Sequence, residues 1–299
     1  MIEPFGRYRG PADESALEDV EWTRLITAEE IETFDRDGVL LLKQALHPEW
    51  IDLVELAYQR VMLSPHSMAR FFRDQPGEFL ESVHNLPHVP ELRQLLIESP
   101  IADMIGALIE STGVWYFLDE FFIKEGGNCG PTPWHQDLPY WPVAGKQFAS
   151  MWINLDPVPQ SECLQFVRGS HRGQVYDGFH PAKVNDDMRA PYYDAELPQV
   201  PDIDAEPDRW DIVSWPIERG DVVFLHPGIL HGGGHTGPDS RRRTWTVRCY
   251  GDDVVYASRP NPALTVPRRP GLGFSLKPGD PLRHLTFPQL RPGKPELVW

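Results

Sequence analysis

The sequence predicts a mainly β protein with helices, built as a β barrel or jelly roll with an N-terminal helical layer. Helical patterns occupy the first third of the chain, short β-branched and aromatic runs follow Gly113, and many prolines and glycines punctuate the second half. Helices followed by a run of short strands are typical of this architecture. A chain of 299 residues is also long enough to bury a sizeable core.

The helical layer is predicted from capping signals and apolar spacing. Thr27–Glu30 has the pattern of a capping box, and Gly38 suits the end of the helix that follows. A second helix is predicted over 48–63, because a proline stands at its first position and apolar residues recur at helical spacing. A further pair is predicted at 91–97 and 100–112.

The β part is predicted from runs that lack helical spacing and are separated by turn residues. Residues 64–90 show neither pattern, so we expect an irregular segment there, of a length that often acts as a lid. We predict an irregular leader over 1–25, one domain over 26–257 and a proline-rich strap over 258–299 packed on that domain. The predicted strands are 39–42, 114–124, 148–155, 163–167, 221–226 and 244–250.

Composition excludes several classes of partner. The net charge of -16 repels nucleic acid and anionic membranes, so neither is an expected partner. Three cysteines, with no Cys-x-x-Cys pair, are typical of reduced thiols in a cytoplasmic protein. The first residues lack the apolar core of a signal peptide, and no run approaches the length of a membrane span. The sequence does not predict an oligomeric state.

The tetrapeptide Trp134-His135-Gln136-Asp137 predicts half of a metal site. In a strand, residues i and i+2 point to the same face, so His135 and Asp137 would present an imidazole and a carboxylate side by side. One neutral nitrogen and one anionic oxygen suit Fe(II), and a second histidine would complete a facial triad with open coordination positions. Alone, a His-x-Asp pair is a weak signal, because such pairs also occur by chance on surfaces.

Two candidates for the second histidine follow the predicted strand 221–226. His226 stands before a Pro-Gly kink, and His231 stands before three glycines. Small residues leave room for a ligand beside a metal, which favours His231. His171 and His235 are interpreted as structural and as part of a solvated loop.

An arginine run follows at Ser240–Arg248. Its first part is typical of a solvated turn, and its second part is typical of a strand with alternate residues pointing inward. 2-Oxoglutarate binds iron through its 2-keto acid end, so its far carboxylate needs a buried cation. Arginine suits that role because it stays ionised and donates two parallel hydrogen bonds.

Taken in order, these motifs resemble the phytanoyl-CoA dioxygenase family of Fe(II)/2-oxoglutarate oxygenases. The resemblance covers roughly residues 26 to 256, and it lies in the order and spacing of the motifs more than in any one of them. The matching stretches are 26–38, Trp134–Asp137 with Pro139–Trp141, Met151–Asp156, Phe166–His171 and Gly220–Gly232.

The resemblance implies a double-stranded β-helix with iron on His135, Asp137 and His231. It places the far carboxylate of 2-oxoglutarate on an arginine about eleven residues after the distal histidine, which here is Arg242, with Arg243 one position away. It also implies that Trp152 borders the co-substrate. Several family members carry a hydroxyl residue at the position that Gly233 occupies here, and this departure removes one hydrogen bond to the co-substrate.

The activity implied is hydroxylation of an unactivated C–H bond of a small organic substrate, using dioxygen and releasing succinate and carbon dioxide. Related halogenases carry a small residue in place of the carboxylate, so Asp137 favours hydroxylation, desaturation or ring formation. Two other classes stay open: a cupin-like metal enzyme that does not use 2-oxoglutarate, and a non-catalytic jelly-roll binding module.

The substrate is not identified by the sequence. Aromatic residues near the motifs suggest a pocket for an apolar or amphipathic molecule, and a coenzyme A thioester would require a local basic patch. The candidates for that patch are Arg168, Arg172 and Arg241 to Arg243. The aromatic candidates are Phe122, Trp134, Tyr140, Trp141 and Phe148.

Overall fold

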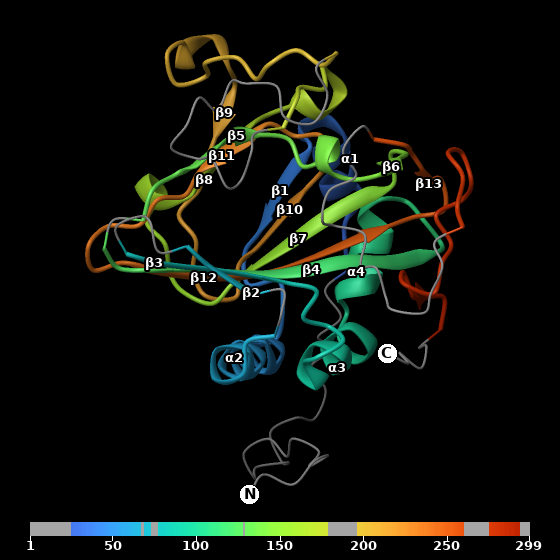
Figure 1. The fold of residues 1–299 in the computed structure, drawn as a ribbon, viewed down its shortest axis with the longest axis horizontal. Helices are drawn as coiled ribbons and strands as arrows, with labels where there is room; N and C mark the ends of the chain where they lie inside the picture. Colours follow the sequence, from blue (N-terminus) through green and yellow to red (C-terminus); the bar gives the residue numbers. More distant parts are fainter. Residues whose placement is uncertain are drawn as a thin grey trace, which may run out of the picture.

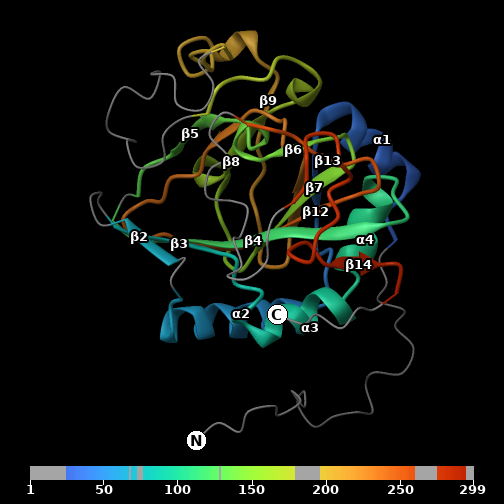
Figure 2. The same cartoon turned by 45° about the vertical axis from the view of Figure 1, so that its right-hand side comes forward.

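The computed structural model describes residues 25–66, 69–72, 77–127, 129–178, 196–259 and 275–293. Within this part of the chain, a large antiparallel sheet faces a smaller one, and helices α2 (Pro48–Leu63) and α3 (Pro90–Glu98) lie beneath the large sheet (Figures 1 and 2). The predicted leader 1–25, apart from Leu25, lies outside the described residues. So do 260–274 and 294–299 of the predicted strap.

The helical layer follows its sequence signals closely. In the capping box, Glu30 N donates to Thr27 Oγ1 at 3.2 Å and Thr27 N donates to Glu30 Oε2 at 2.9 Å. Gly38 ends this helix in the left-handed region, with φ of 73°. No helix among the described residues is long and apolar enough to cross a membrane. The α-helices are α1 (Ala28–Asp37), α2 (Pro48–Leu63), α3 (Pro90–Glu98) and α4 (Ile101–Leu108).

The large sheet runs in the order β1-β10-β7-β12-β4-β3-β2, and β14 pairs with β4. From β1 to β4 the neighbouring strands are far apart in sequence, as a jelly roll requires, whereas β4, β3 and β2 are consecutive in the chain. The order and the antiparallel pairing confirm the predicted fold class. Its strands are β1 (Val39–Leu42), β2 (Ala69–Phe72), β3 (Glu78–Val83), β4 (Val114–Glu125), β7 (Phe148–Asn154), β10 (Val222–Leu225), β12 (Arg241–Tyr250) and β14 (Gln289–Arg291).

The small sheet runs in the order β5-β11-β8-β9 and lies on the side of the large sheet away from α2 and α3 (Figure 1). A two-stranded sheet of β6 and β13 stands apart from both. Short 3-10 helices occur between strands: η2 (Leu138–Tyr140), η3 (Gln160–Glu162), η4 (Ser170–Arg172) and η6 (Pro207–Arg209). The remaining strands are β5 (Thr132–His135), β6 (Val143–Ala144), β8 (Leu164–Val167), β9 (Ile212–Val213), β11 (His231–Gly233) and β13 (Val255–Tyr256).

Strand alternation gives the large sheet two different faces. On β12, Trp245, Val247 and Cys249 are buried in the core that α2, α3 and α4 complete. The alternate residues of β12 face the space between the two sheets, and they are Arg242, Thr244, Thr246 and Arg248. The interior of the jelly roll is therefore polar along one strand, whereas the layer beneath the sheet is apolar.

The prediction of an irregular segment over 64–90 is wrong at 69–72 and 78–83, where strands form, and its role as a lid stays a prediction. Strands β2 and β3 form a hairpin that extends the large sheet beyond β4. On β3, only Leu80 is a large apolar residue that is fully buried, and Glu78 at the start of the strand is exposed. The alternation is consequently too weak to predict the strand from its sequence.

The described part of the predicted strap packs on the β structure. Strand β14 pairs with β4, and Leu282 and Phe287 are buried beside Phe117 and Tyr250. The division into leader, domain and strap stays a prediction.

One buried carboxylate joins the sheet to the helical layer. Asp119 on β4 is fully buried and accepts hydrogen bonds from Tyr116 Oη at 2.7 Å and Trp245 Nε1 at 3.1 Å. It also accepts from Asn85 Nδ2 at 2.9 Å and Leu86 N at 3.0 Å. Removing one acceptor residue would therefore leave four buried donors without a partner.

We expect Asp119→Ala to lower the free energy of unfolding by about 4 kcal/mol or more, because each orphaned donor costs about 1–3 kcal/mol. Urea unfolding monitored by tryptophan fluorescence measures the loss. Asp208→Asn, at an exposed surface carboxylate, is the control and should change the midpoint little. A loss below about 1 kcal/mol for Asp119→Ala would contradict this role.

Candidate metal centre

Two histidines meet across the pairing of β5 and β11. His135 is the last residue of β5, His231 is the first residue of β11, and the two stand opposite each other in the antiparallel register. Their ring centroids are 4.2 Å apart. The register of the small sheet therefore brings together two residues separated by almost a hundred positions in the chain.

Asp137 completes the group, but not by strand alternation as the sequence analysis predicts. Strand β5 ends at His135, and Asp137 has helical backbone angles, φ −73° and ψ −32°, at the start of η2. This turn brings Asp137 Oδ1 to 3.5 Å from His135 Nε2 and 4.0 Å from His231 Nε2. Leu138 N donates to Pro227 O at 2.9 Å, which fixes the turn against the loop before β11.

Backbone carbonyls set the tautomer of both imidazoles. His135 Nδ1 lies 2.8 Å from Pro133 O, and His231 Nδ1 lies 3.1 Å from Ile229 O. A carbonyl oxygen only accepts, so each Nδ1 must carry the proton and donate. Each Nε2 then carries the lone pair, as metal-binding histidines held by a second hydrogen bond do.

The electrostatics favour a neutral His231 imidazole beside an ionised carboxylate. Burial and, after it, the neighbouring His135 lower the pKa of His231 to about 4. Burial alone would raise the pKa of Asp137, but the hydrogen bond with His135 and the positive charges around it hold that pKa below its usual range. These are the protonation states that a divalent cation requires of its ligands.

The donor set fits a mononuclear transition metal. One atom from each of His135, Asp137 and His231 lies within 4.8 Å of the others. Asp137 Oδ2 is buried without a hydrogen-bond partner, and buried polar atoms are seldom left unpaired. Two imidazole nitrogens and one carboxylate with open positions are the ligand set of non-haem Fe(II) sites.

The other candidate histidines lie outside this group. His226 Nδ1 accepts from Gly228 N at 3.0 Å, and its ring packs on His171 with centroids 5.1 Å apart. His171 in turn contacts Asp35 O through Nε2 at 3.1 Å. The two side chains contact each other and nearby backbone atoms, and neither belongs to the His-Asp-His group, in keeping with the choice of His231 over His226.

Strand alternation separates the two adjacent arginines of the run. Arg243 points away from the interior and binds Asp156 through Nε at 2.9 Å and Nη2 at 2.8 Å, and it also pairs with Glu55. Arg242 points inward and is buried, with Nε and Nη1 lacking any hydrogen-bond partner among the described residues. Burial lowers the pKa of the Arg242 guanidinium to about 10, so it remains a cation at neutral pH.

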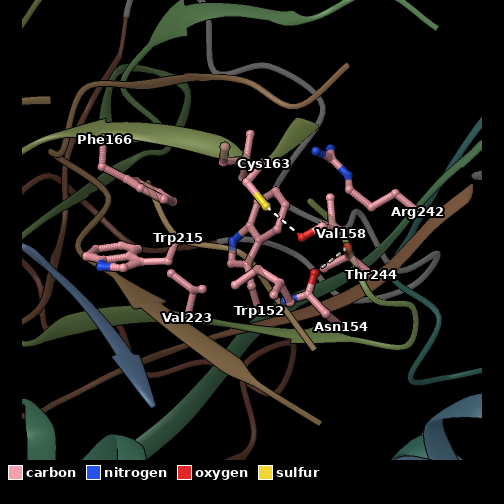
Figure 3. Close-up of a pocket in the computed structure, with 11 residues that line it drawn as sticks. Trp152, Asn154, Val158, Cys163, Phe166, Trp215, Val223, Arg242 and Thr244 are labelled. Atoms are coloured by element: carbon pink, nitrogen blue, oxygen red, sulfur yellow. Dashed lines mark hydrogen bonds between the residues drawn. The ribbon is translucent and has the colours of Figure 1, made fainter. Parts of the chain in front are cut away.

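Arg242 lines a pocket between the sheets (Figure 3). Asn154 and Thr244 lie with Arg242 at one end of the pocket, and Phe166 lies at the other. Phe166 pairs with His231 in the register of β8 and β11 and their ring centroids are 6.1 Å apart, so this end of the pocket adjoins His231. The full lining is Trp152, Asn154, Val158, Cys163, Leu164, Phe166, Trp215, Ile217, Val223, Arg242 and Thr244.

Gly233, the last residue of β11, and Gly234, which follows it, leave space that a side chain would fill. Gly233 has φ of 80°, and an added Cβ would lie 3.3 Å from Cys163 O. A hydroxyl residue would be strained there, which accounts for the departure from the family pattern. Gly234 has φ of 72°, and an added Cβ would overlap the Arg242 guanidinium.

Sequence reasoning missed two buried cations on this face. Lys124 stands opposite Arg242 in the sheet, and its Nζ donates to Gly130 O at 2.7 Å and Gly234 O at 2.9 Å. Arg248 pairs with Glu120 at 2.9 Å and lies 3.8 Å from Asp137 Oδ2. Its position six residues after Arg242 on one strand, hence on the same face, is the signal that could have identified it.

The predicted aromatic pocket is largely core packing. Trp141 and Phe148 are buried in the cluster around Phe117 and Tyr250. Phe122 stacks on Trp152 with ring centroids 5.2 Å apart. Trp134 packs on the outer side of the small sheet with Val167 and Leu230, and only Tyr140 lies beside the histidine pair, 6.2 Å from His135.

The structure is an antiparallel jelly roll with two imidazoles and a carboxylate at one point of its interior. These features define the class of double-stranded β-helix proteins with a mononuclear metal centre. Residues 34–243, well over half of the chain, match the phytanoyl-CoA dioxygenase (PhyH) family. The chain belongs to this family, which confirms the resemblance found in its sequence.

Relatives and solved structures agree with this assignment. The chain is 23% identical to the peroxisomal phytanoyl-CoA dioxygenase of Mus musculus over 231 residues, 76% of this chain and 62% of the mouse protein. It is 27% identical to a probable phytanoyl-CoA dioxygenase of Caenorhabditis elegans over 124 residues, 41% of this chain and 37% of that protein. The matches therefore span less than two thirds of these relatives.

The solved structure of the epimerase SnoN in complex with Fe3+, α-ketoglutarate and nogalamycin RO has the same fold. Its TM-score is 0.69 at 21% sequence identity, over 88% of this chain and 98% of that chain. The structure of EctD from S. alaskensis with 2-oxoglutarate and 5-hydroxyectoine gives a TM-score of 0.57 at 19% identity, over 76% of each chain.

The two adjacent arginines should differ in their effect on stability. We expect Arg243→Met to lower the free energy of unfolding of the metal-free protein by about 3 kcal/mol, because it removes the cation from Glu55 and leaves the buried Asp156 with Arg241 alone. Arg242→Met removes an unpaired buried charge, so we expect a change below about 1 kcal/mol or a gain. Urea unfolding of both variants measures the difference, and an equal loss in the two would contradict it.

Proposed function

We propose that this protein is an Fe(II)- and 2-oxoglutarate-dependent dioxygenase that hydroxylates an unactivated C–H bond of a small organic substrate. The observation that carries the proposal is Arg242, a buried guanidinium with two nitrogens unpaired among the described residues, which lines a pocket whose other end adjoins His231. A cupin-like metal enzyme that does not use 2-oxoglutarate has no need of a buried, unpaired arginine in the pocket beside its metal. A non-catalytic module has no need of the His-Asp-His group.

In this proposal His135, Asp137 and His231 hold Fe(II). The two Nε2 atoms and the Asp137 carboxylate would be its protein ligands. Iron with 2-oxoglutarate supplies the oxidative chemistry that cleaves the C–H bond, with release of succinate and carbon dioxide. The carbonyls of Pro133 and Ile229 keep the imidazoles oriented through their Nδ1 atoms.

Arg242 would bind the far carboxylate of 2-oxoglutarate through its free Nε and Nη1. Its low exposure excludes competing water and strengthens the charge-assisted bonds. Trp152 would border the co-substrate, since its ring lines the pocket and is fixed by stacking on Phe122. Asn154 accepts from Thr244 Oγ1 at 3.1 Å, which holds the polar end of the pocket.

The same residues bear on the type of reaction and on the class of substrate. Asp137 occupies the position that a halogenase would need empty for chloride, so we propose hydroxylation. Three of the five arginines that could have formed a patch for coenzyme A are paired with carboxylates: Arg168 binds Asp211, and Arg241 and Arg243 bind Asp156. Arg172 donates to Arg36 O, and Arg242 is the arginine that we assign to the co-substrate. We therefore propose a substrate without coenzyme A. Absence of nucleic-acid and membrane partners and a cytoplasmic location stay predictions.

Anaerobic titration with Fe(II) and 2-oxoglutarate tests the cofactor assignment. We expect a weak visible charge-transfer band in the wild type and none in Asp137→Ala, which loses the anionic ligand. Arg242→Met should require about 10- to 100-fold more 2-oxoglutarate, because it removes charge-assisted bonds worth about 1.5–3 kcal/mol. Absence of the band in the wild type at saturating 2-oxoglutarate would contradict the proposal.

A pair of glycine variants tests the position of Arg242 without changing any charge. Gly234→Ala should displace the guanidinium and raise the 2-oxoglutarate concentration needed for half of the band by about 10-fold. Gly279→Ala imposes a similar backbone strain, with φ of 93°, but an added Cβ there meets no atom within 4 Å. This control should lose stability of about 1 kcal/mol and keep the wild-type titration. Equal titrations in the two variants would contradict the assignment.

A further inference from the structure

Lys124 is a second buried cation directly beside Arg242. The two residues stand opposite each other in the register of β4 and β12, so their Cβ atoms are about 4.5–5.5 Å apart on the same face of the sheet. Lys124 is 3% exposed and Arg242 is 5% exposed. The partners of the Lys124 ammonium among the described residues are two backbone carbonyls and the ring of Phe79, so none of them carries a negative charge.

The two carbonyls connect Lys124 to both strands of the candidate metal centre. Its Nζ donates to Gly130 O at 2.7 Å and to Gly234 O at 2.9 Å. Gly130 precedes β5 and Gly234 follows β11, and these two strands carry the histidines. Gly234 also packs on Arg242, because an added Cβ there would overlap the guanidinium. Lys124 therefore holds the backbone against which Arg242 lies.

The charge of Lys124 is set by its neighbour as well as by burial. Two like charges buried side by side repel each other, and the lysine is the one that can lose its proton, because a guanidinium stays ionised. Burial and, after it, Arg242 lower the pKa of Lys124 to about 7. A neutral amine keeps two N–H groups, which is enough for both carbonyls. Loss of the proton thus changes the charge beside Arg242 and keeps the two hydrogen bonds.

The other titratable groups on this face are engaged elsewhere. On β4, Glu120 pairs with Arg248 at 2.9 Å, and on β3, Glu81 lies 4.0 Å from Arg70. The buried Cys129, before β5, donates its thiol to backbone carbonyls. The groups that act on the guanidinium itself include Cys163 and Glu162, and His235, after Gly234, is exposed.

We propose that Lys124 is a positioning residue for Arg242, and that the far carboxylate of 2-oxoglutarate draws a proton onto Lys124 when it binds. The inference rests on the proposed function and adds a pH-dependent control of co-substrate binding at that same site. A carboxylate at Arg242 offsets the repulsion between the two cations and so favours the ammonium form of Lys124. The protein with a charged Lys124 should in turn bind 2-oxoglutarate more tightly, since the linkage is reciprocal.

The direction of the pH effect follows from this linkage. Below pH about 7, Lys124 is charged with and without 2-oxoglutarate, so the affinity does not change with pH. Above that pH, the free protein has lost the proton and the complex regains it. At pH 8 we expect an uptake of about 0.5 to 0.9 proton per 2-oxoglutarate bound, and a Kd that rises by about 3- to 8-fold per pH unit.

Calorimetry of 2-oxoglutarate binding to the anaerobic Fe(II)-loaded protein measures the proton uptake. Titrations at pH 8 in two buffers with different heats of protonation give the number of protons. The visible charge-transfer band, followed from pH 6.5 to pH 8.5, gives Kd at each pH. Both measurements on the wild type test the linkage without any substitution.

Two variants of Lys124 separate its charge from its hydrogen bonds. Lys124→Met removes both, so we expect a Kd about 10-fold higher at pH 6.5 and a proton uptake lower by about 0.5 to 0.9 at pH 8. Lys124→Gln keeps two N–H donors without a titratable charge, so it should bind more tightly than Lys124→Met and lose the same proton uptake. Lys43→Met is the matched control, because Lys43 Nζ also donates to a backbone carbonyl, Pro216 O, at 2.8 Å. It should keep the wild-type uptake and Kd.

Equal proton uptake in the wild type and in both Lys124 variants overturns the inference, because another group would then take the proton. Wild-type affinity at pH 6.5 in Lys124→Met overturns the positioning role. A normal band in the wild type without proton uptake at pH 8 contradicts this inference alone. Absence of 2-oxoglutarate binding to the wild type contradicts the proposed function and the inference together.

Discussion

The antiparallel pairing of β5 with β11 is the constraint on which the candidate centre depends. It puts His135 opposite His231 and leaves the following residues free to turn, so that Asp137 returns to the same point. The carbonyls that accept from each Nδ1 belong to residues two positions earlier in the chain. The register thus fixes the position of both rings, and the local backbone fixes which nitrogen each ring presents.

The large sheet contributes a face of cations around this centre. Alternation along β12 sends Arg242 and Arg248 inward and Arg243 outward, and the outward arginine is fully engaged with Asp156 and Glu55. A fold that buries two arginines with free N–H groups gives up stability that apolar residues would have supplied. That loss is understandable if anions bind there.

Much of the fold was predictable because local signals and tertiary packing agree. The helix over 48–63 has apolar residues at helical spacing, and the strands around Phe117, Met151 and Trp245 are runs rich in aromatic and β-branched residues, since each lies in a large core. The strands that carry the centre lack such signals. Strand β5 contains a proline and β11 is two-thirds glycine, because their positions are set by the neighbouring sheet and by the space around the site rather than by propensity.

The sequence by itself determined the ligand types, their order along the chain, the family and the general architecture, because these depend on residue identity and on short-range spacing. Only the tertiary structure decided that Asp137 reaches the centre through a turn, that Arg242 rather than Arg243 faces the pocket, and that Arg248 adjoins Asp137. Each of these depends on strand register and on which face of the sheet is interior. A one-residue shift in strand register moves each side chain to the other face of the sheet. The sequence alone does not show which strand is the partner that sets this register.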